Sequence, residues 1–418
     1  MRTPAFLCAA ALAVAIPALA LEPSAVEKAA RSEATRGLKA ITKRLAGPGY
    51  MGRDNATPES SKAQRYLIRK LRRLGEGVHG GRAYDAYRQP FVRGDNMGTN
   101  LVAVIPGREL PNEVVLVGGH YDHLGTRSDA NGDCRSRGVP GGVRCPGATD
   151  NAAGTAIVLA IGKAIRSLPE PPRRTVALVL WDSEEDGLVG SRYWVSDEPL
   201  IPLAQTVAYV NFDLQGSNLL PSLARTSFAV GAETGGSALG GFVAGAVAKE
   251  DIDTAPVSYL FGELRSDYAN LVQYGRVPTV FFGDSSGPCY HHVGDTIENV
   301  DFAKLRLQSR VGFRTVMAIA EADERPPFVD PATIPPVTYA DAVSIERVFR
   351  RADPDVPVYF TPADQLLLRR IQADLAGVVG AGPAAFDGTA IGVTANAALQ
   401  GIAAIGRIPC GAFSVRRR

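Results

Sequence analysis

The sequence has no excess of charge of either sign. Its 45 lysine and arginine residues are nearly balanced by 43 aspartate and glutamate residues, which gives a formal net charge of +2 at pH 7. Proteins whose main partner is nucleic acid or an anionic membrane surface usually carry a marked basic excess. The charge balance therefore argues against both of these partners.

Long apolar runs are absent after residue 20. Before that point, Arg2 supplies a positive charge, residues 5–16 form an apolar stretch, and residues 18–20 are small residues of the kind found at a cleavage site. The apolar stretch is short and ends at Pro17, which favours a cleaved secretory signal over a membrane anchor. We therefore expect residues 1–20 to be a signal peptide, the mature chain to be periplasmic or extracellular, and no other segment to span a membrane.

Cysteine is scarce: the chain has five, and no Cys-x-x-Cys pair occurs, which argues against a zinc finger. Cys8 falls in the expected signal peptide. The other four indicate disulfides if the protein is exported. Cys134 and Cys145 share one glycine- and arginine-rich loop, and pairing them leaves Cys289 with Cys410. Four cysteines allow three pairings, so the other two stay open on sequence grounds.

Alternating strand and helix patterns predict an α/β fold, and 418 residues allow one large domain plus an appendage. Strands are predicted at residues 84–91, 99–105, 206–212 and 278–282, and the apolar runs at residues 114–117 and 175–181 are typical of buried strands. Helical periodicity marks residues 22–45, 60–74, 155–168 and 362–375. The alanine- and glycine-rich residues 228–248 are broken by Glu233 and read as core helix and loop.

The strand at residues 114–117 is followed by His120 and Asp122. Open α/β sheets place their ligand sites outside the carboxyl ends of their strands. An imidazole there, with a carboxylate two residues on, suits a metal ligand and the group that orients it. The alternative, a surface histidine and aspartate, is not excluded by this stretch alone.

Three more strand ends, and the start of one helix, carry the same residue types. Asp150 stands just before the helix at residues 155–168, where an N-cap is the commonest role. Four acidic residues lie within residues 182–186, and adjacent carboxylates repel each other unless a cation or a proton neutralises them. Asp213 ends one strand, and His291 follows another. Since four of the five histidines occur in two of these segments, the pattern predicts a polar site at this edge of the sheet.

The motifs HYD, TDNAAG, EEDGLVGS, NFDLQG and CYHHVGDT, in this order, resemble those of the co-catalytic dizinc metallopeptidases. That family includes bacterial secreted leucyl aminopeptidases, glutaminyl cyclases and glutamate carboxypeptidase II. The resemblance spans about residues 51–320. It implies a three-layer αβα fold with a central mixed, mostly parallel sheet. Residues 21–325 would form the metallopeptidase domain, and residues 326–418 a C-terminal extension or small accessory subdomain.

The resemblance also implies a role for each motif residue and two zinc ions as cofactors. The implied ligands are His120 and Asp213 for one zinc, Glu185 and His291 for the other, and Asp150 as the carboxylate that bridges both. Glu184 would be the general base, and Asp122 would orient His120. Tyr290 and Arg265 resemble positions that contact substrate, and Tyr290 could donate a hydrogen bond to the oxyanion. His123 is expected behind the ligands or at the surface, and His292 is set aside in favour of His291.

The function implied is a secreted zinc aminopeptidase acting on peptides with a free N-terminus, through a hydroxide held between the two metals. A glutaminyl-cyclase-like acyltransferase and a carboxypeptidase on the same fold are the alternatives. The cyclase typically needs one working metal, so a complete ligand set favours the peptidase. A metal-free binding ectodomain is a further alternative, which loss of ligands would mark; none is lost in this sequence.

Overall fold

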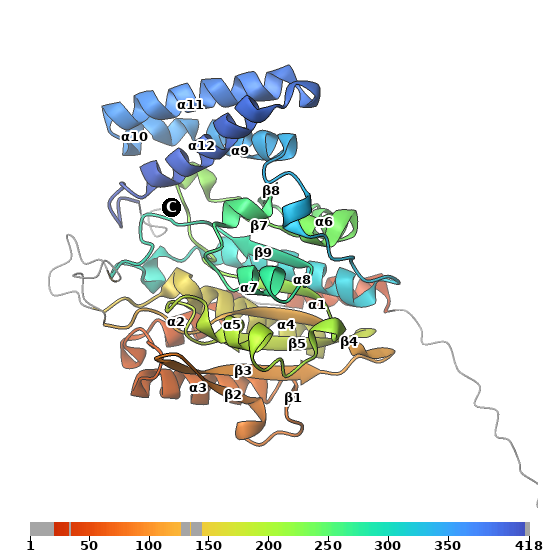
Figure 1. Ribbon diagram of the computed structural model, residues 1–418. Helices are drawn as coiled ribbons and strands as arrows, with labels where there is room; N and C mark the ends of the chain where they lie inside the picture. Colours follow the sequence, from red (N-terminus) through yellow and green to blue (C-terminus); the bar gives the residue numbers. More distant parts are fainter. Residues whose placement is uncertain (1–20, 33–34, 127–133, 135–143, 414–418) are drawn as a thin grey trace, which may run out of the picture.

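A nine-stranded mixed sheet runs through the protein (Figure 1). The computed structural model describes residues 21–32, 35–126, 134 and 144–413, so the expected signal peptide lies outside the described residues. Along the sheet the strand order is β1-β3-β5-β4-β6-β9-β7-β8, and β2 pairs with β3. The strands are β1 Glu76–Gly77, β2 Arg88–Arg93, β3 Asn96–Ile105, β4 Leu110–His120, β5 Arg174–Trp181, β6 Thr206–Phe212, β7 Thr226–Val230, β8 Asp253–Val257 and β9 Thr279–Gly283.

The four strands at the centre of the sheet, β5, β4, β6 and β9, run parallel to one another. Strand β3 is antiparallel to β5 on one side, and β7 is antiparallel to β9 on the other, with β8 parallel to β7. Because these four strands are parallel, their carboxyl ends all lie at the same edge of the sheet. Polar residues that follow these strands are thereby collected in one place.

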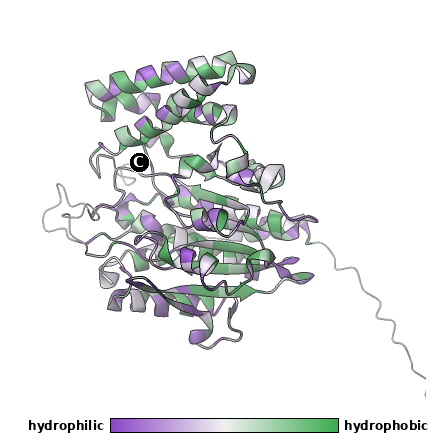
Figure 2. Ribbon diagram, in the orientation of Figure 1, coloured by the Kyte–Doolittle hydropathy of each residue, from purple (hydrophilic) through white to green (hydrophobic). Residues whose placement is uncertain are grey.

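Both faces of the sheet are covered, which makes the three-layer arrangement that the family resemblance implies. Val115 and Val117 of β4 pack in one apolar cluster, whereas Val114 and Leu116 pack in another on the opposite face. The first face is covered by α1 Pro23–Ser32, α2 Thr35–Leu45, α3 Pro58–Leu71, α4 Ala153–Arg166, α6 Gly236–Val247 and α8 Phe302–Glu321. The second face is covered by α5 Val189–Ser196 and α7 Tyr268–Gln273. The strands at the sheet centre are correspondingly coloured hydrophobic in Figure 2.

Most of the predicted strands form, and the differences have local causes. Residues 85–87 make a turn of 3₁₀ helix, so β2 starts only at Arg88. Strands β7 and β8 are missing from the prediction: residues 228–248 hold the end of β7 as well as α6. Both strands are five residues long, and β8 contains Pro256, a residue that argues against a central strand. The proline is tolerated because β8 is the last strand in the sheet order.

The C-terminal segment folds into four helices that lie beyond the β7–β8 end of the sheet (Figure 1). We call this group the helical unit; it consists of α9 Tyr339–Ala352, α10 Val356–Tyr359, α11 Pro362–Ala381 and α12 Gly388–Ile405. Its apolar residues Phe360, Leu368 and Ile405 pack with Leu219 and Leu223 from the segment after β6. The unit is therefore joined to the rest of the fold by an apolar interface.

Two disulfides are present, and they are the favoured sequence pairing: Cys134 with Cys145, and Cys289 with Cys410. The second joins the loop after β9 to the segment after α12. Among the described helices, α12 alone has the length and apolar composition to cross a membrane, criteria that a helix of a folded core also meets. Here α12 packs against α9 and α11.

Candidate metal centre

The carboxyl ends of β4, β5, β6 and β9 bring the predicted site residues together. His120 is the last residue of β4, and Asp213 follows directly after β6. Glu184 and Glu185 lie in the turn after β5, His291 lies in the loop after β9, and Asp150 lies in the turn before α4. The sequence placed five of these residues after strands and Asp150 before a helix, and the parallel order of the central strands makes them neighbours.

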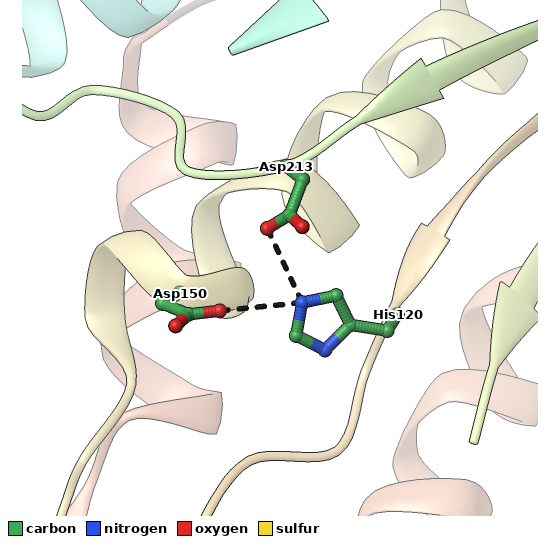
Figure 3. Close-up of side chains that lie close together, drawn as sticks. All are labelled: His120, Asp150 and Asp213. Carbon is green, nitrogen blue, oxygen red and sulfur yellow. Dashed lines mark hydrogen bonds and ion pairs between the residues drawn. The ribbon is translucent and has the colours of Figure 1, made fainter. Parts of the chain in front are cut away.

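The first cluster centres on His120, a fully buried side chain (Figure 3). Its Nε2 atom lies 3.2 Å from Asp150 Oδ1 and 3.2 Å from Asp213 Oδ1. On the other side of the ring, Nδ1 lies 3.5 Å from Asp122 Oδ1 and 3.2 Å from the Asp122 carbonyl oxygen. One ring nitrogen thus faces the carboxylates while Asp122 fixes the other, which is the usual arrangement of a metal-binding histidine.

The second cluster shares Asp150 with the first. His291 Nε2 lies 3.0 Å from Glu185 Oε2 and 3.5 Å from Asp150 Oδ2. The two oxygens of Asp150 therefore face different histidines, Oδ1 toward His120 and Oδ2 toward His291. A carboxylate placed in this way can bridge two cations.

The electrostatics of these clusters fit bound metal. Burial raises the pKa of Glu184 well above its usual value, and burial also raises the pKa of Asp213. Burial by itself would raise the pKa of Glu185, but His291 and His123 lie against it and hold it well below the usual value. In addition, Asp150 Oδ2 is buried and accepts no hydrogen bond from the described residues. Carboxylates crowded out of water in this way need a cation, and mixed imidazole and carboxylate donors suit zinc.

Among the described residues, three overlapping sets of ligand atoms lie close enough to hold an ion, with all atoms of a set within 4.8 Å of one another. These sets are His120, Asp150 and Asp213; His120, Glu184 and Glu185; and His123, Asp150 and Glu185. The residues present therefore fit a metal centre on their own geometry.

Residues 100–314, about half of the chain, match the model of Peptidase family M28. The chain belongs to peptidase family M28. It is therefore a member of a family of zinc-dependent metallopeptidases, and the resemblance seen in the sequence is confirmed.

Curated relatives of this M28 protein match over part of their length. Leupeptin-inactivating enzyme 1 of Streptomyces exfoliatus is 31% identical over 129 residues, which cover 31% of this chain and 25% of the relative. The probable glutamate carboxypeptidase LAMP1 of Arabidopsis thaliana is 29% identical over 245 residues, 54% of this chain and 32% of the relative. The chain thus spans about a quarter to a third of these two relatives.

Solved structures share the fold of this M28 chain. The LapA aminopeptidase of Legionella pneumophila superposes with a TM-score of 0.57 at 20% identity, covering 72% of this chain and 76% of LapA. The glutaminyl cyclase of Bacteroides thetaiotaomicron gives a TM-score of 0.54 at 15% identity, with coverages of 68% and 97%. These likenesses confirm the predicted αβα architecture.

Glu184 and the two predicted substrate-contacting residues lie at a cavity beside the M28 metal centre. Glu184 Oε2 is 3.9 Å from His120 Nε2, and Glu184 lines the cavity together with Arg265 and Tyr290. Arg265 donates a hydrogen bond of 3.0 Å to the Tyr290 hydroxyl oxygen, and the Tyr290 ring stacks on His291 at 3.8 Å between centroids. The structure therefore brings all the predicted site residues to one place.

One of the two places predicted for His123, at the surface, is wrong, because the side chain is fully buried. Its Nδ1 atom lies 2.5 Å from Glu185 Oε1 and 3.8 Å from Asp150 Oδ2. Glu185 is thus held between two histidines. His292 Nδ1 accepts a hydrogen bond of 2.8 Å from the Gly294 amide. Neither His291 nor His292 belongs to the three ligand sets, in which His123 accompanies Asp150 and Glu185.

Asp295 fixes the turn that carries Asp150. It accepts hydrogen bonds from the Thr149 amide at 3.0 Å, from the Thr149 hydroxyl at 2.8 Å and from the Asp150 amide at 3.1 Å. The sequence analysis gave Asp295 no role of its own. Its contacts join the loop after β9 to the turn before α4.

Arg53 is a functional candidate that the sequence analysis missed. Its buried guanidinium donates hydrogen bonds to the carbonyl oxygens of Tyr121 at 2.6 Å, Pro146 at 2.6 Å and Gly147 at 2.7 Å. Burial lowers its pKa to about 10, so the group remains charged at pH 7. A single arginine in a turn has no periodicity or spacing that would have revealed this role.

We expect Arg53→Met to weaken zinc binding by about 10- to 100-fold, because the loops that carry His120 and Asp150 lose their shared donor. Competition with a chromophoric chelator measures this affinity. Arg73→Met, at an exposed position, removes the same charge and should leave the affinity unchanged. Equal zinc affinity in Arg53→Met and the native protein would contradict a positioning role for Arg53.

Proposed function

We propose that this M28 protein is a zinc aminopeptidase that removes N-terminal residues from peptides. The observation that carries the proposal is the Asp150 carboxylate, which faces one histidine–carboxylate cluster with each oxygen. In this proposal two zinc ions are bound, one by His120 and Asp213, and the other by Glu185 and His291. Asp150 contributes to both.

The chain's own groups then divide the work of hydrolysis. Bound zinc would polarise the scissile carbonyl and lower the pKa of a bound water molecule to about 7. Glu184 takes the proton of the attacking water and passes it to the leaving amine. Asp122 holds the His120 ring in place through Nδ1. The hydrogen bond from Arg265 polarises the Tyr290 hydroxyl. This hydroxyl donates a hydrogen bond to the carbonyl oxygen of the substrate, which becomes negatively charged during the reaction.

The charges around the cavity favour an aminopeptidase over a carboxypeptidase. Four carboxylate side chains are among the described residues that line it: Asp150, Glu184, Asp213 and Glu263. In this proposal Asp150 and Asp213 are zinc ligands and Glu263 pairs with Arg265, so Glu184 is the carboxylate left to attract the α-ammonium of a free N-terminus. A carboxypeptidase needs a cation for the substrate carboxylate, and Arg265 is the one arginine or lysine among those described residues. It already lies 3.4 Å from Glu263 and donates to Tyr290.

Carboxypeptidase action is nevertheless the second candidate, because Arg265 lines the cavity and curated relatives are named as probable glutamate carboxypeptidases. We also propose that the protein works outside the cytoplasm. Its two disulfides are of the kind that form and persist in oxidising compartments.

Hydrolysis of leucine-p-nitroanilide beside its N-acetylated analogue tests the proposal. We expect cleavage of the free-amine substrate alone, loss of cleavage with a chelator, and recovery on adding zinc. Cleavage of a C-terminal residue from an N-blocked dipeptide, with the free-amine anilide left intact, would establish the carboxypeptidase instead. Pyroglutamate formation from a glutaminyl peptide would establish the cyclase.

A further inference from the structure

The cavity beside the metal centre continues into the helical unit. Its volume is about 150 Å³, and Asp150, Glu184, Asp213 and His291 line it at the metal centre. Other lining residues come from α9 and α12: Ile345, Val348, Phe349, Ala398, Ile402 and Ile405. Both helices lie outside residues 100–314, the part that matches the family. A wall of this cavity is therefore supplied by a segment that the family match does not include.

We propose that α9 and α12 form one wall of the pocket for the substrate side chain, and that this wall selects a large apolar residue at the N-terminus of the peptide. The inference rests on the proposed aminopeptidase function and names its substrate class.

The character of the cavity supports this choice of ligand. The sheet contributes Phe228, Val230, Val257 and Phe281 to the lining of the cavity. All lining residues that come from β7, β8, β9, α9 and α12 are uncharged. A lysine or glutamate side chain would lose its hydration there and gain no partner in return. An apolar side chain would instead leave water for contact with apolar groups.

The size of the cavity agrees with a large side chain. An apolar cavity of about 150 Å³ in another protein is known to bind benzene. A leucine or phenylalanine side chain therefore has room, whereas an alanine side chain would leave most of the space unfilled. One methylene in an apolar pocket typically changes kcat/KM by about 10- to 200-fold, so the preference for leucine over alanine should be large.

The wall is fixed in position relative to the metal centre. The Cys289–Cys410 disulfide ties the segment after α12 to the loop that carries Tyr290 and His291. Helices α9 and α12 also pack closely, since a Cβ atom added at Gly401 would come within 2.9 Å of Phe349 Cζ. A rigid wall at a fixed distance from the reacting bond is what a specificity pocket needs.

Neighbouring positions on α12 provide a matched test. Ala398 lines the cavity, whereas Leu399 is 56% exposed. We would measure kcat/KM for the p-nitroanilides of leucine, phenylalanine and alanine with the native protein, Ala398→Trp and Leu399→Trp. The native protein should prefer leucine and phenylalanine over alanine by at least tenfold. Ala398→Trp should lower kcat/KM for the two large substrates at least tenfold and for alanine less than threefold, and Leu399→Trp should change none of them more than twofold.

Two results would overturn the pocket: turnover of all three substrates without an apolar preference, or an equal loss for all three in Ala398→Trp while its circular dichroism remains native. If Ala398→Trp does not fold, Ile402→Ala takes its place. By enlarging the pocket, it should raise the ratio of phenylalanine to leucine turnover at least threefold, and an unchanged ratio would refute the assignment.

Binding of 4-phenylbutylamine, measured calorimetrically on the zinc-loaded protein, separates the pocket from the proposed function. Ala398→Trp, or an Ile402→Trp replacement, should weaken this binding at least tenfold, whereas Leu399→Trp should not. That pattern without any anilide hydrolysis would overturn the aminopeptidase function and leave the pocket standing. Equal binding by the native protein and the cavity variants would overturn the pocket even if hydrolysis is observed.

Discussion

Replacing Glu184 with glutamine or alanine is expected to lower kcat by about 10²- to 10⁴-fold while zinc content stays near normal. The reason is its position: the carboxylate lines the cavity and lies 3.9 Å from His120 Nε2, farther than the 3.2 Å contacts of Asp150 and Asp213 with that atom. Steady-state hydrolysis of leucine-p-nitroanilide, together with metal analysis of the purified variant, measures both quantities.

Glu198→Gln is the matched control for this experiment, because Glu198 is exposed and the same charge is removed. It should leave both kcat and zinc content unchanged. Loss of zinc in Glu184→Gln would show that Glu184 is a ligand and that Glu185 is the base. Retained activity with full zinc content would remove Glu184 from the mechanism.

Replacing Lys304 with methionine is expected to lower the free energy of unfolding by about 3–5 kcal/mol, because a buried charge loses its partner. Lys304 Nζ lies 2.9 Å from Asp284 Oδ1, and both side chains are buried. Burial raises the pKa of Asp284, and Lys304 opposes that shift. Urea unfolding monitored by circular dichroism gives the difference between the native protein and the variant.

Lys28→Met serves as the control, since Lys28 is exposed on α1 and its loss should change the free energy of unfolding by less than about 0.5 kcal/mol. The double variant Lys304→Met/Asp284→Asn should recover part of the stability, because no charge is then left unpaired. A change below about 1 kcal/mol in Lys304→Met would mean that water reaches Asp284 and solvates it.

The sheet centre and the place of the polar site could be predicted because each depends on local patterns. Residues 114–117 are apolar on both faces, as expected of a strand that is covered on both sides. His120 follows two glycines later, as the last residue of the strand. Parallel strands then bring together ligands that are far apart in the chain. The same reasoning failed for β8, where Pro256 hides the strand and only its place at the sheet edge explains it.

The residues that support the centre could not be predicted, because their roles depend on contacts between distant segments. Arg53 reaches carbonyl groups about a hundred residues away, and nothing in its own neighbourhood marks it. Ile345 and Ile402 look like ordinary residues of apolar helix faces in the sequence. Only the packing of the helical unit on the β7–β8 end of the sheet brings them to the cavity that residues of the metal centre also line.

The Cys289–Cys410 link can form only late in synthesis, because Cys410 follows all the metal-cluster residues in the chain. The metal-cluster residues, from His120 to His291, leave the ribosome well before α12 and Cys410 are made. A nascent or truncated chain that stops after α8 would carry every proposed zinc ligand, yet it would lack part of the pocket wall and the partner of Cys289. Selectivity for substrate is thus acquired after the zinc ligands are in place, and its completion waits for translation of α12 and for oxidation of one cysteine pair.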